Sequence, residues 1–303
     1  MKKSDPLLKP NTEAERLHYA TGELLGADDF RDEQTYHRRQ LARALLFLHG
    51  SGTIAGLRVV ARHLPGSDPS LDDVELEVEP GLALDRAGRL IEVPRPACLR
   101  VRRWYEFIGN QPPDSDGLDV DDLRTAFDNV DSVVADIYLT FHPCDRGYTP
   151  AFASGPFDAL DASQPSRVRD AYELSLVPRE PDPLPAFDPW AGIHDAPAAL
   201  RPEVARQFSL NAWRMLAIPP PDTLPEAQNP AGVDPTAVLL ARLSIPAGPA
   251  LDGESAPVPD WTAGAWPVPT PPPPAPAEVT PNVDNTVRNF LLPPAALLHL
   301  LST

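Results

Sequence analysis

Few residues of this chain could perform chemistry, and the sequence does not bring them together in one complete catalytic or ligand-binding motif. His142, Cys144 and Asp145 could supply metal ligands, but no second pair of ligands stands at a metal-site spacing. Residues 50–55, Gly-Ser-Gly-Thr-Ile-Ala, match the loose dinucleotide pattern G-x-G-x-x-A. That pattern binds nucleotides between a strand and a following helix, whereas here a helix precedes it and a strand follows. We therefore expect no catalytic, metal-binding or cofactor-binding residues, and we expect that the protein is not an enzyme.

Other residues leave alternatives open. Glu33 and His37 are four apart on a predicted helix, and we expect a packing contact between them rather than a catalytic pair. Trp261 and Trp266 lie in a proline-rich stretch, where they could stack on sugars or anchor a partner, or could hold that stretch against the domain. The chain has 43 Asp and Glu residues, so the two facing carboxylates of a glycan hydrolase stay an alternative.

Composition narrows the class of protein. The formal net charge is −17, and such a surface repels phosphate backbones, so we expect no nucleic-acid partner. The two cysteines, Cys98 and Cys144, cannot form a disulfide framework, and their redox state is open. We find no apolar run of membrane-spanning length and no secretory signal. These features predict synthesis in the cytoplasm and no membrane span.

A long helix is predicted from residue 27 to residue 49. Asp28 and Asp29 would favour its positive end, and Gly26 is an acceptable N-cap. Gly50 and Gly52 would end it. Apolar and semi-polar residues recur at spacings of three and four and predict one buried face: Phe30, Gln34, His37, Leu41, Leu45 and Leu48.

A small antiparallel β unit should follow, with the helix packed on it. Residues 54–62 read as one strand, and apolar residues alternate with glutamates over residues 74–79. Gly81 follows a proline at a turn, and Asp85 and Gly88 lie in the hairpin of residues 82–93. Residues 99–104 would add a further strand.

The remainder of the chain is dominated by proline. Of 40 prolines, only seven precede residue 111. Proline removes a backbone donor and fixes φ, so we expect short elements with long proline-rich connections. The predicted fold is α+β and mostly β. Its segments are an N-terminal arm (1–20), the helix and β unit (21–110), an acidic linker (111–131), an irregular second β region with one helix near 202–217 (132–245), and a proline-rich segment with an apolar end (246–303).

Several blocks resemble structural proteins of contractile, phage-tail-like injection particles. Residues 19–37 resemble the family's opening "aromatic-x-x-G-x-L-L-x-x-x-D-F-x-x-E-Q-x-Y-H", and residues 48–59 resemble "L-H-G-x-G-V-V-x-G-L-x-V". Residues 80–91 are similar to "P-G-x-A-x-D-x-x-G-R-x-I", and residues 166–174 to a further recurring block. The resemblance weakens after about residue 178 and carries no catalytic residue with it.

The resemblance implies a non-enzymatic, baseplate-associated or accessory subunit of such a particle. Its expected partners are other tail or baseplate subunits and further copies of itself, and the particle would carry it out of the cell. The alternatives are a receptor-binding or glycan-binding appendage of the same kind of particle and a cell-wall glycan hydrolase. Residues proposed to contact partners lie towards the C-terminus: Trp261, Trp266, Phe290, Leu297 and Leu301.

Overall fold

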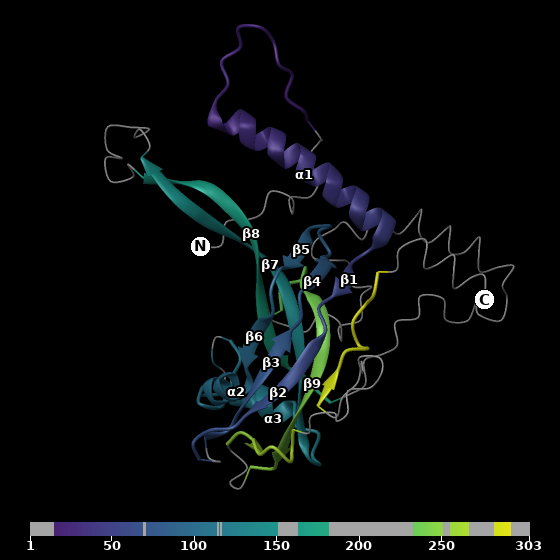
Figure 1. Cartoon of the computed structure of the whole chain (residues 1–303), viewed down its shortest axis with the longest axis vertical. Coiled ribbons are helices and arrows are strands. Elements are labelled where there is room, and N and C mark those ends of the chain that lie inside the picture. The colour runs from purple at the N-terminus through teal and green to yellow at the C-terminus, as the bar shows by residue number, and fades with distance from the viewer. Residues whose placement is uncertain are drawn as a thin grey trace, which may run out of the picture.

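The predicted class, α+β and mostly β, is confirmed by a computed structural model. It describes residues 15–68, 71–113, 115, 117–150, 163–181, 233–250, 255–266 and 282–291. Helix α1 (Ala27–His49) leaves one end of a body of sheets, and helices α2 (Val101–Gly109) and α3 (Val120–Thr125) lie at the other (Figure 1). Within the described residues, none of these helices combines the length and the apolar character needed to cross a membrane.

The strands form three antiparallel sheets in the described part of the chain. The first has the order β1-β4-β5, the second β2-β3-β6, and the third β10-β9-β7-β8 with β11 also paired to β9. Their bounds are β1 Gly52–Gly56, β2 Val59–Leu64, β3 Asp73–Val78, β4 Gly81–Leu84, β5 Leu90–Val93, β6 Ala97–Arg100, β7 Ser132–Pro150, β8 Ser163–Pro178, β9 Val238–Gly248, β10 Val258–Pro259 and β11 Val283–Asp284.

The single strand expected over residues 54–62 is two strands in two different sheets. Gly56 and Leu57 both have positive φ, 62° and 58°, which breaks the extended backbone between β1 and β2. The Leu57 side chain is fully buried at this break. The sequence pattern could not reveal the switch because both halves read as apolar and β-branched.

Two further expectations in the first half were wrong. Residues 99–104, expected as a strand, contain the end of β6 and the start of α2, which buries Val101, Tyr105 and Ile108. The acidic stretch 111–131, expected as a linker, contains α3. The carboxylate of Asp119 caps this helix by accepting the backbone N–H groups of Asp121 and Asp122. Leu123 of α3 belongs to one hydrophobic core that also holds residues of both predicted β regions, so this stretch does not separate two domains.

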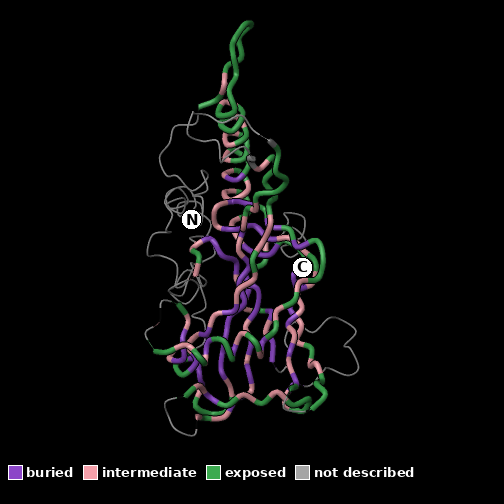
Figure 2. Tube along the Cα trace, turned by 90° about the vertical axis from the view of Figure 1, so that its left-hand side faces the viewer, coloured by how far each residue is buried: buried purple, intermediate pink, exposed green. Residues whose placement is uncertain are grey.

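Strands β7 and β8 are much longer than residues 133–142 and 171–177, where they were expected. Strand β9 pairs only with residues 132–139 of β7, whereas β8 pairs with β7 as far as Pro150. Beyond residue 139, where β9 stops pairing, β7 and β8 continue as a two-stranded ribbon that leaves the body at the same end as α1 (Figure 1). We call residues 142–149 of β7 and 165–172 of β8 the ribbon. Most of its residues are exposed (Figure 2).

The proline-rich segment is not separate from the fold where the structure describes it. Strand β9 continues through Ala247, and β10 and β11 both pair with β9. Trp266 and Val283 lie in the common core. The segment boundary expected at residue 246 is therefore wrong. The helix predicted near 202–217 and the residues Leu297 and Leu301 lie outside the described residues.

The bounds of α1 and its N-cap, Gly26, are confirmed, and Gly50 is its C-cap, but its predicted packing is wrong. Of its residues, only Ala42 is buried. The positions that are at least half-buried around it follow one face, through Thr35, Arg39, Arg43 and Leu46. Five residues of the predicted stripe lie exposed on the other side of the helix, whereas its sixth residue, Leu45, is partly buried: the exposed residues are Phe30, Gln34, His37, Leu41 and Leu48. A periodic pattern identifies an apolar face but not what covers it.

The turn between β4 and β5 supports the one buried position of α1. Gly88 has φ 78°, and a Cβ built on it would lie 2.0 Å from the carbonyl oxygen of Ala42. Glycine is therefore required at this position both by its backbone conformation and by the close approach of the helix.

Replacing Gly88 with alanine should lower the free energy of unfolding by about 1–3 kcal/mol, because the new side chain combines positive-φ strain with a backbone clash. Urea unfolding followed by circular dichroism measures this. Gly248→Ala is the matched control, since a Cβ there meets nothing within 4 Å and its φ is ordinary. Equal stability of the two variants would contradict the close packing of Gly88 against Ala42.

Candidate assembly surface

The block that carries Asp85 and Gly88 forms a buried ion-pair joint. The Asp85 carboxylate accepts the backbone N–H groups of Ala87 and Arg89 at 2.9 and 2.8 Å, and the Arg89 Nε at 2.6 Å. Burial raises the pKa of the Asp85 carboxyl above its usual value, although Arg89 and these backbone N–H groups oppose the rise. The arrangement closes the β4–β5 hairpin.

The same arginine ties this hairpin to the third sheet. Its Nη2 donates to the Thr236 hydroxyl at 2.9 Å, just before β9, and its guanidinium lies 4.6 Å from the ring centroid of Phe141 in β7. Arg86 Nη1 donates to the Pro235 carbonyl at 3.2 Å. The residues of this motif therefore hold two sheets together.

The second block, around Gly50 and Gly52, receives the last described stretch of the chain. The backbone N–H of Thr53 donates to Asn289, and that of Leu291 donates back to Thr53, both at 2.8 Å. The Asn285 side-chain amide spans the N–H and carbonyl of Val59, at 2.8 and 3.1 Å. Residues 282–291 are thus hydrogen-bonded to β1, to β2 and to the connection between them. The glycine at position 52 lets the backbone of Asn289 approach closely.

Two of the residues proposed to contact partners are turned inward. Trp266 is only 3% exposed and donates its Nε1–H to the Asp260 carbonyl at 2.8 Å. Trp261 stacks on it, with the two ring planes 8° apart, and contacts the ring of Tyr105 edge-on. These indoles hold residues 255–266 against the body. Partner contact through the Trp266 ring, as expected from sequence, is therefore contradicted.

Phe290 differs from these tryptophans because its ring is exposed. The guanidinium of Arg288 lies 4.7 Å from its ring centroid, and Phe290 forms an isolated bridge to Thr53. Of the residues proposed to contact partners, Phe290 is available for such a contact. Phe290 lies near the C-terminal end of α1, since the next residue, Leu291, approaches the C-cap Gly50.

Charged side chains cluster on β3 and β6 but are already paired. Glu75, Glu77 and Cys98 could place three ligand atoms within 4.8 Å of one another. Arg100 neutralises Glu75 at 3.3 Å, and Arg62 neutralises Glu77 at 2.9 Å. Desolvation and the Glu75 carboxylate raise the pKa of the Cys98 thiol, which disfavours the thiolate that a metal requires. This cluster fits a cross-strand charge network better than a metal site.

The other candidate ligands lie apart from that cluster, on β7. His142 approaches Glu173 of the paired strand β8, with 3.7 Å between Nδ1 and the carboxylate. The Cys144 thiol lies 3.7 Å from the His142 carbonyl oxygen. These contacts are those of an exposed two-stranded ribbon.

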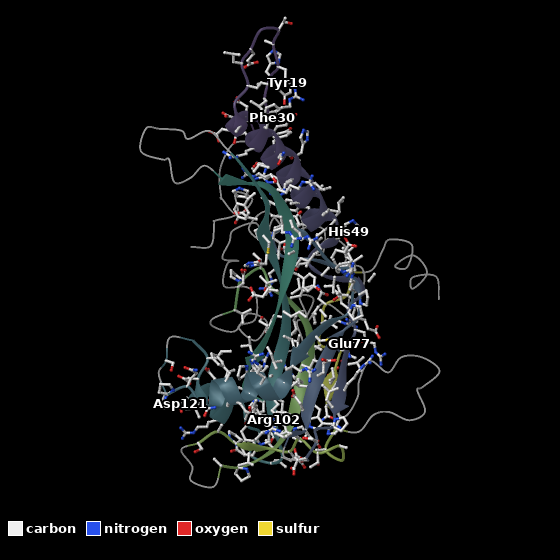
Figure 3. All side chains as sticks on the ribbon, turned by 60° about the vertical axis from the view of Figure 1, so that its left-hand side comes forward. Tyr19, Phe30, His49, Glu77, Arg102 and Asp121 are labelled. Atoms are coloured by element: carbon white, nitrogen blue, oxygen red, sulfur yellow. The ribbon has the colours of Figure 1, made fainter. Side chains whose placement is uncertain are left out.

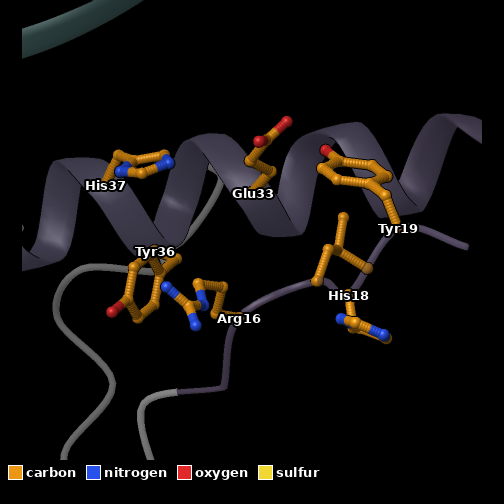
Figure 4. A pocket seen from close by; sticks show the side chains of 7 residues that line it. Arg16, His18, Tyr19, Glu33, Tyr36 and His37 are labelled. Carbon is orange, nitrogen blue, oxygen red and sulfur yellow. The ribbon is translucent and has the colours of Figure 1, made fainter.

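A hollow beside the N-terminal half of α1 is lined by the arm and the helix (Figure 4). A hydrogen bond with Glu33 is the main cause that raises the pKa of the Tyr19 hydroxyl. The ring of His37 contacts Tyr36 edge-on, with 5.4 Å between centroids. Tyr19 is thus a neighbour of Glu33 and Tyr36 a neighbour of His37, and the expected packing contact between Glu33 and His37 stays a prediction. Glu33 is the one carboxylate in the lining, so this hollow lacks the facing pair that a glycan hydrolase needs.

The outward face of α1 is the main unpartnered apolar feature that the structure describes. Leu41 is 57% exposed and Leu48 76% exposed, and Phe30 is also exposed. Figure 3 shows Phe30 near the far end of the helix and His49 where the helix meets the sheets. We call the exposed row formed by Phe30, Gln34, His37, Leu41, Ala44 and Leu48 the outer stripe.

The ribbon adds exposed apolar residues at the same end of the molecule. Tyr148 and Val168 are largely exposed on β7 and β8. The sequence concealed them, because Pro143 and Gly147 interrupt the strand pattern after Phe141. The outer stripe and the ribbon together form the candidate assembly surface. Its exposed apolar residues suit contact with other protein chains.

Replacing Asp85 with alanine should cost about 3–5 kcal/mol of stability, because it leaves the buried Arg89 guanidinium without its counter-charge. Asp85→Asn should cost less, since an amide oxygen can still accept the two backbone hydrogen bonds. Denaturant unfolding monitored by tryptophan fluorescence checks the order of these variants. A loss below 1 kcal/mol for Asp85→Ala would contradict the structural role of the joint.

Neither a protein-family model nor a curated protein sequence matches this chain.

Proposed function

We propose that the protein is a non-enzymatic structural subunit, baseplate-associated or accessory, of a contractile phage-tail-like injection particle. The observation that carries this proposal is the outer stripe of α1, an apolar helix face that points away from the body. Soluble monomers rarely expose contiguous apolar surface without a partner. The resemblance of residues 19–37, 48–59 and 80–91 to subunits of such particles supplies the kind of assembly.

The ribbon supports the same role. A two-stranded ribbon is marginally stable in water when neither face is covered, and most of the described ribbon residues are exposed. The ribbon carries Arg146, Arg167 and Arg169 together with Asp145 and Asp170, so it is polar and of mixed charge, unlike the strongly acidic chain as a whole. An element of this kind gains stability when a neighbouring subunit packs on it.

The alternatives have less support. A glycan-binding appendage was expected to use Trp261 or Trp266, but these rings contact each other, Tyr105 and the core. A cell-wall hydrolase was expected to hold two facing carboxylates in a pocket, and the hollow beside α1 has one. Exposed apolar groups are instead found at Phe290 and along the outer stripe of α1.

The proposal predicts that disrupting the outer stripe removes the protein from particles without unfolding it. A full-length chain carrying Leu41→Asp and Leu48→Asp should keep the wild-type melting temperature, since both side chains are exposed. It should be depleted at least tenfold from purified sheath-and-tube particles, measured by quantitative mass spectrometry in a strain whose native copy is deleted.

Leu71→Asp is the matched control, because Leu71 is 59% exposed, almost as much as Leu41, but lies on the β2–β3 connection. This variant should enter particles as the wild type does. Absence of the wild-type protein from purified particles would refute the proposed function, and so would normal incorporation of the doubly substituted chain.

A further inference from the structure

The outer stripe has the spacing of a coiled-coil seam. Gln34, Leu41 and Leu48 occupy one heptad position, a, and Phe30, His37 and Ala44 occupy the other, d. All six residues are exposed, and they cover roughly three heptads. The half-buried residues that face the body lie off this seam. A helix that uses one face for its own body and presents a second face with a/d spacing suits packing against another helix.

The charges beside the seam select the partner and its direction. Glu33 lies on one flank, at position g, and Arg38 on the other, at position e. In a parallel, in-register pair, a residue at g faces the residue five positions later at e of the other helix, so Glu33 would meet Arg38 of a second copy. In an antiparallel pair centred on the seam, Arg38 would meet Arg38 of that copy, which is repulsive.

The attachment of α1 to its own body is compatible with the parallel arrangement. The helix joins the sheets at its C-terminal end, near Gly50. Towards its N-terminal end, the arm lines a hollow with Glu33, Tyr36 and the seam residue His37. The ribbon leaves the same end of the body (Figure 1). In copies related by a rotation axis parallel to α1, the bodies would therefore all lie at one end of the helical bundle, and the ribbons would all extend towards its other end.

We propose that α1 forms a parallel, in-register helical bundle with α1 of further copies of this chain. The apolar residues Phe30, Leu41 and Leu48 supply the contact area, and Glu33 pairs with Arg38 across each interface. The polar residues Gln34 and His37 occupy the centre of the seam, where polar groups fix register at a cost in affinity. The inference deepens the proposed structural role by naming one partner. Its test needs no particle, so the two can fail separately.

The mass of the full-length chain in solution is the first test, by light scattering or sedimentation over a range of concentrations. The wild type should reach a defined oligomer, and Leu41→Asp with Leu48→Asp should be monomeric at the same concentrations. Leu71→Asp should assemble as the wild type does. A wild-type chain that stays monomeric, or a doubly substituted chain that still assembles, would overturn the inference even if the protein is later found in particles.

Charge exchange tests the direction of the helices. Glu33→Arg alone and Arg38→Glu alone should each weaken association about two- to fivefold for each ion pair lost. The two changes together should restore it, because they rebuild the pair with reversed polarity. These residues are five apart on one helix and do not face each other within it. Failure of the double variant to recover would contradict parallel pairing.

A cross-link provides an independent readout of register. In a chain whose native cysteines are replaced by serine (Cys98→Ser, Cys144→Ser), Leu48→Cys should form an intermolecular disulfide under mild oxidation. In an antiparallel pair centred on the seam, the two positions would be about 27 Å apart, since 18 residues at 1.5 Å each separate them. An oligomer that forms but never cross-links at this position would rule out the parallel arrangement.

Discussion

The fold depends on one buried joint, where Arg89 is held by Asp85 and reaches across to a second sheet. The pair closes the β4–β5 hairpin, and the guanidinium also contacts Thr236 before β9 and the Phe141 ring of β7. The turn of this hairpin supports α1 at its one buried position, through Gly88 and Ala42. The β4–β5 hairpin thus positions both the helix and the start of the ribbon. This explains why Asp85, Gly88 and Arg89 lie so close together in the sequence.

Local elements could be predicted well from the sequence because their causes are local. The bounds of α1 follow from Gly26, the acidic first turn and Gly50, and the β3 alternation follows from the period of a strand. Contacts between distant segments could not be predicted. Asp136, buried between Arg179 and Arg242, joins β7 to residues about 43 and 106 positions away, and no pattern in the sequence pairs these three charges.

The proline-rich region shows why composition misleads about the core. Proline disfavours regular structure, so the stretch after residue 246 read as an appendage. Few positions are needed to join such a segment to a core, however, and here Trp266, Val283 and Asn285 provide them by burial and side-chain hydrogen bonds. Sparse anchors of this kind carry no periodicity. They were visible only as isolated aromatic and amide residues between prolines, which fit a surface role equally well.

The stripe on α1 was correctly identified as an apolar face and wrongly assigned to the protein's own core. Most helical stability in proteins comes from packing an apolar face. The described contacts of α1 with its own body bury only Ala42 and leave the richer face outside. Helix propensity and the capping of its ends cannot replace that missing packing. In the proposed helical bundle, α1 of further copies supplies that packing to the outer stripe.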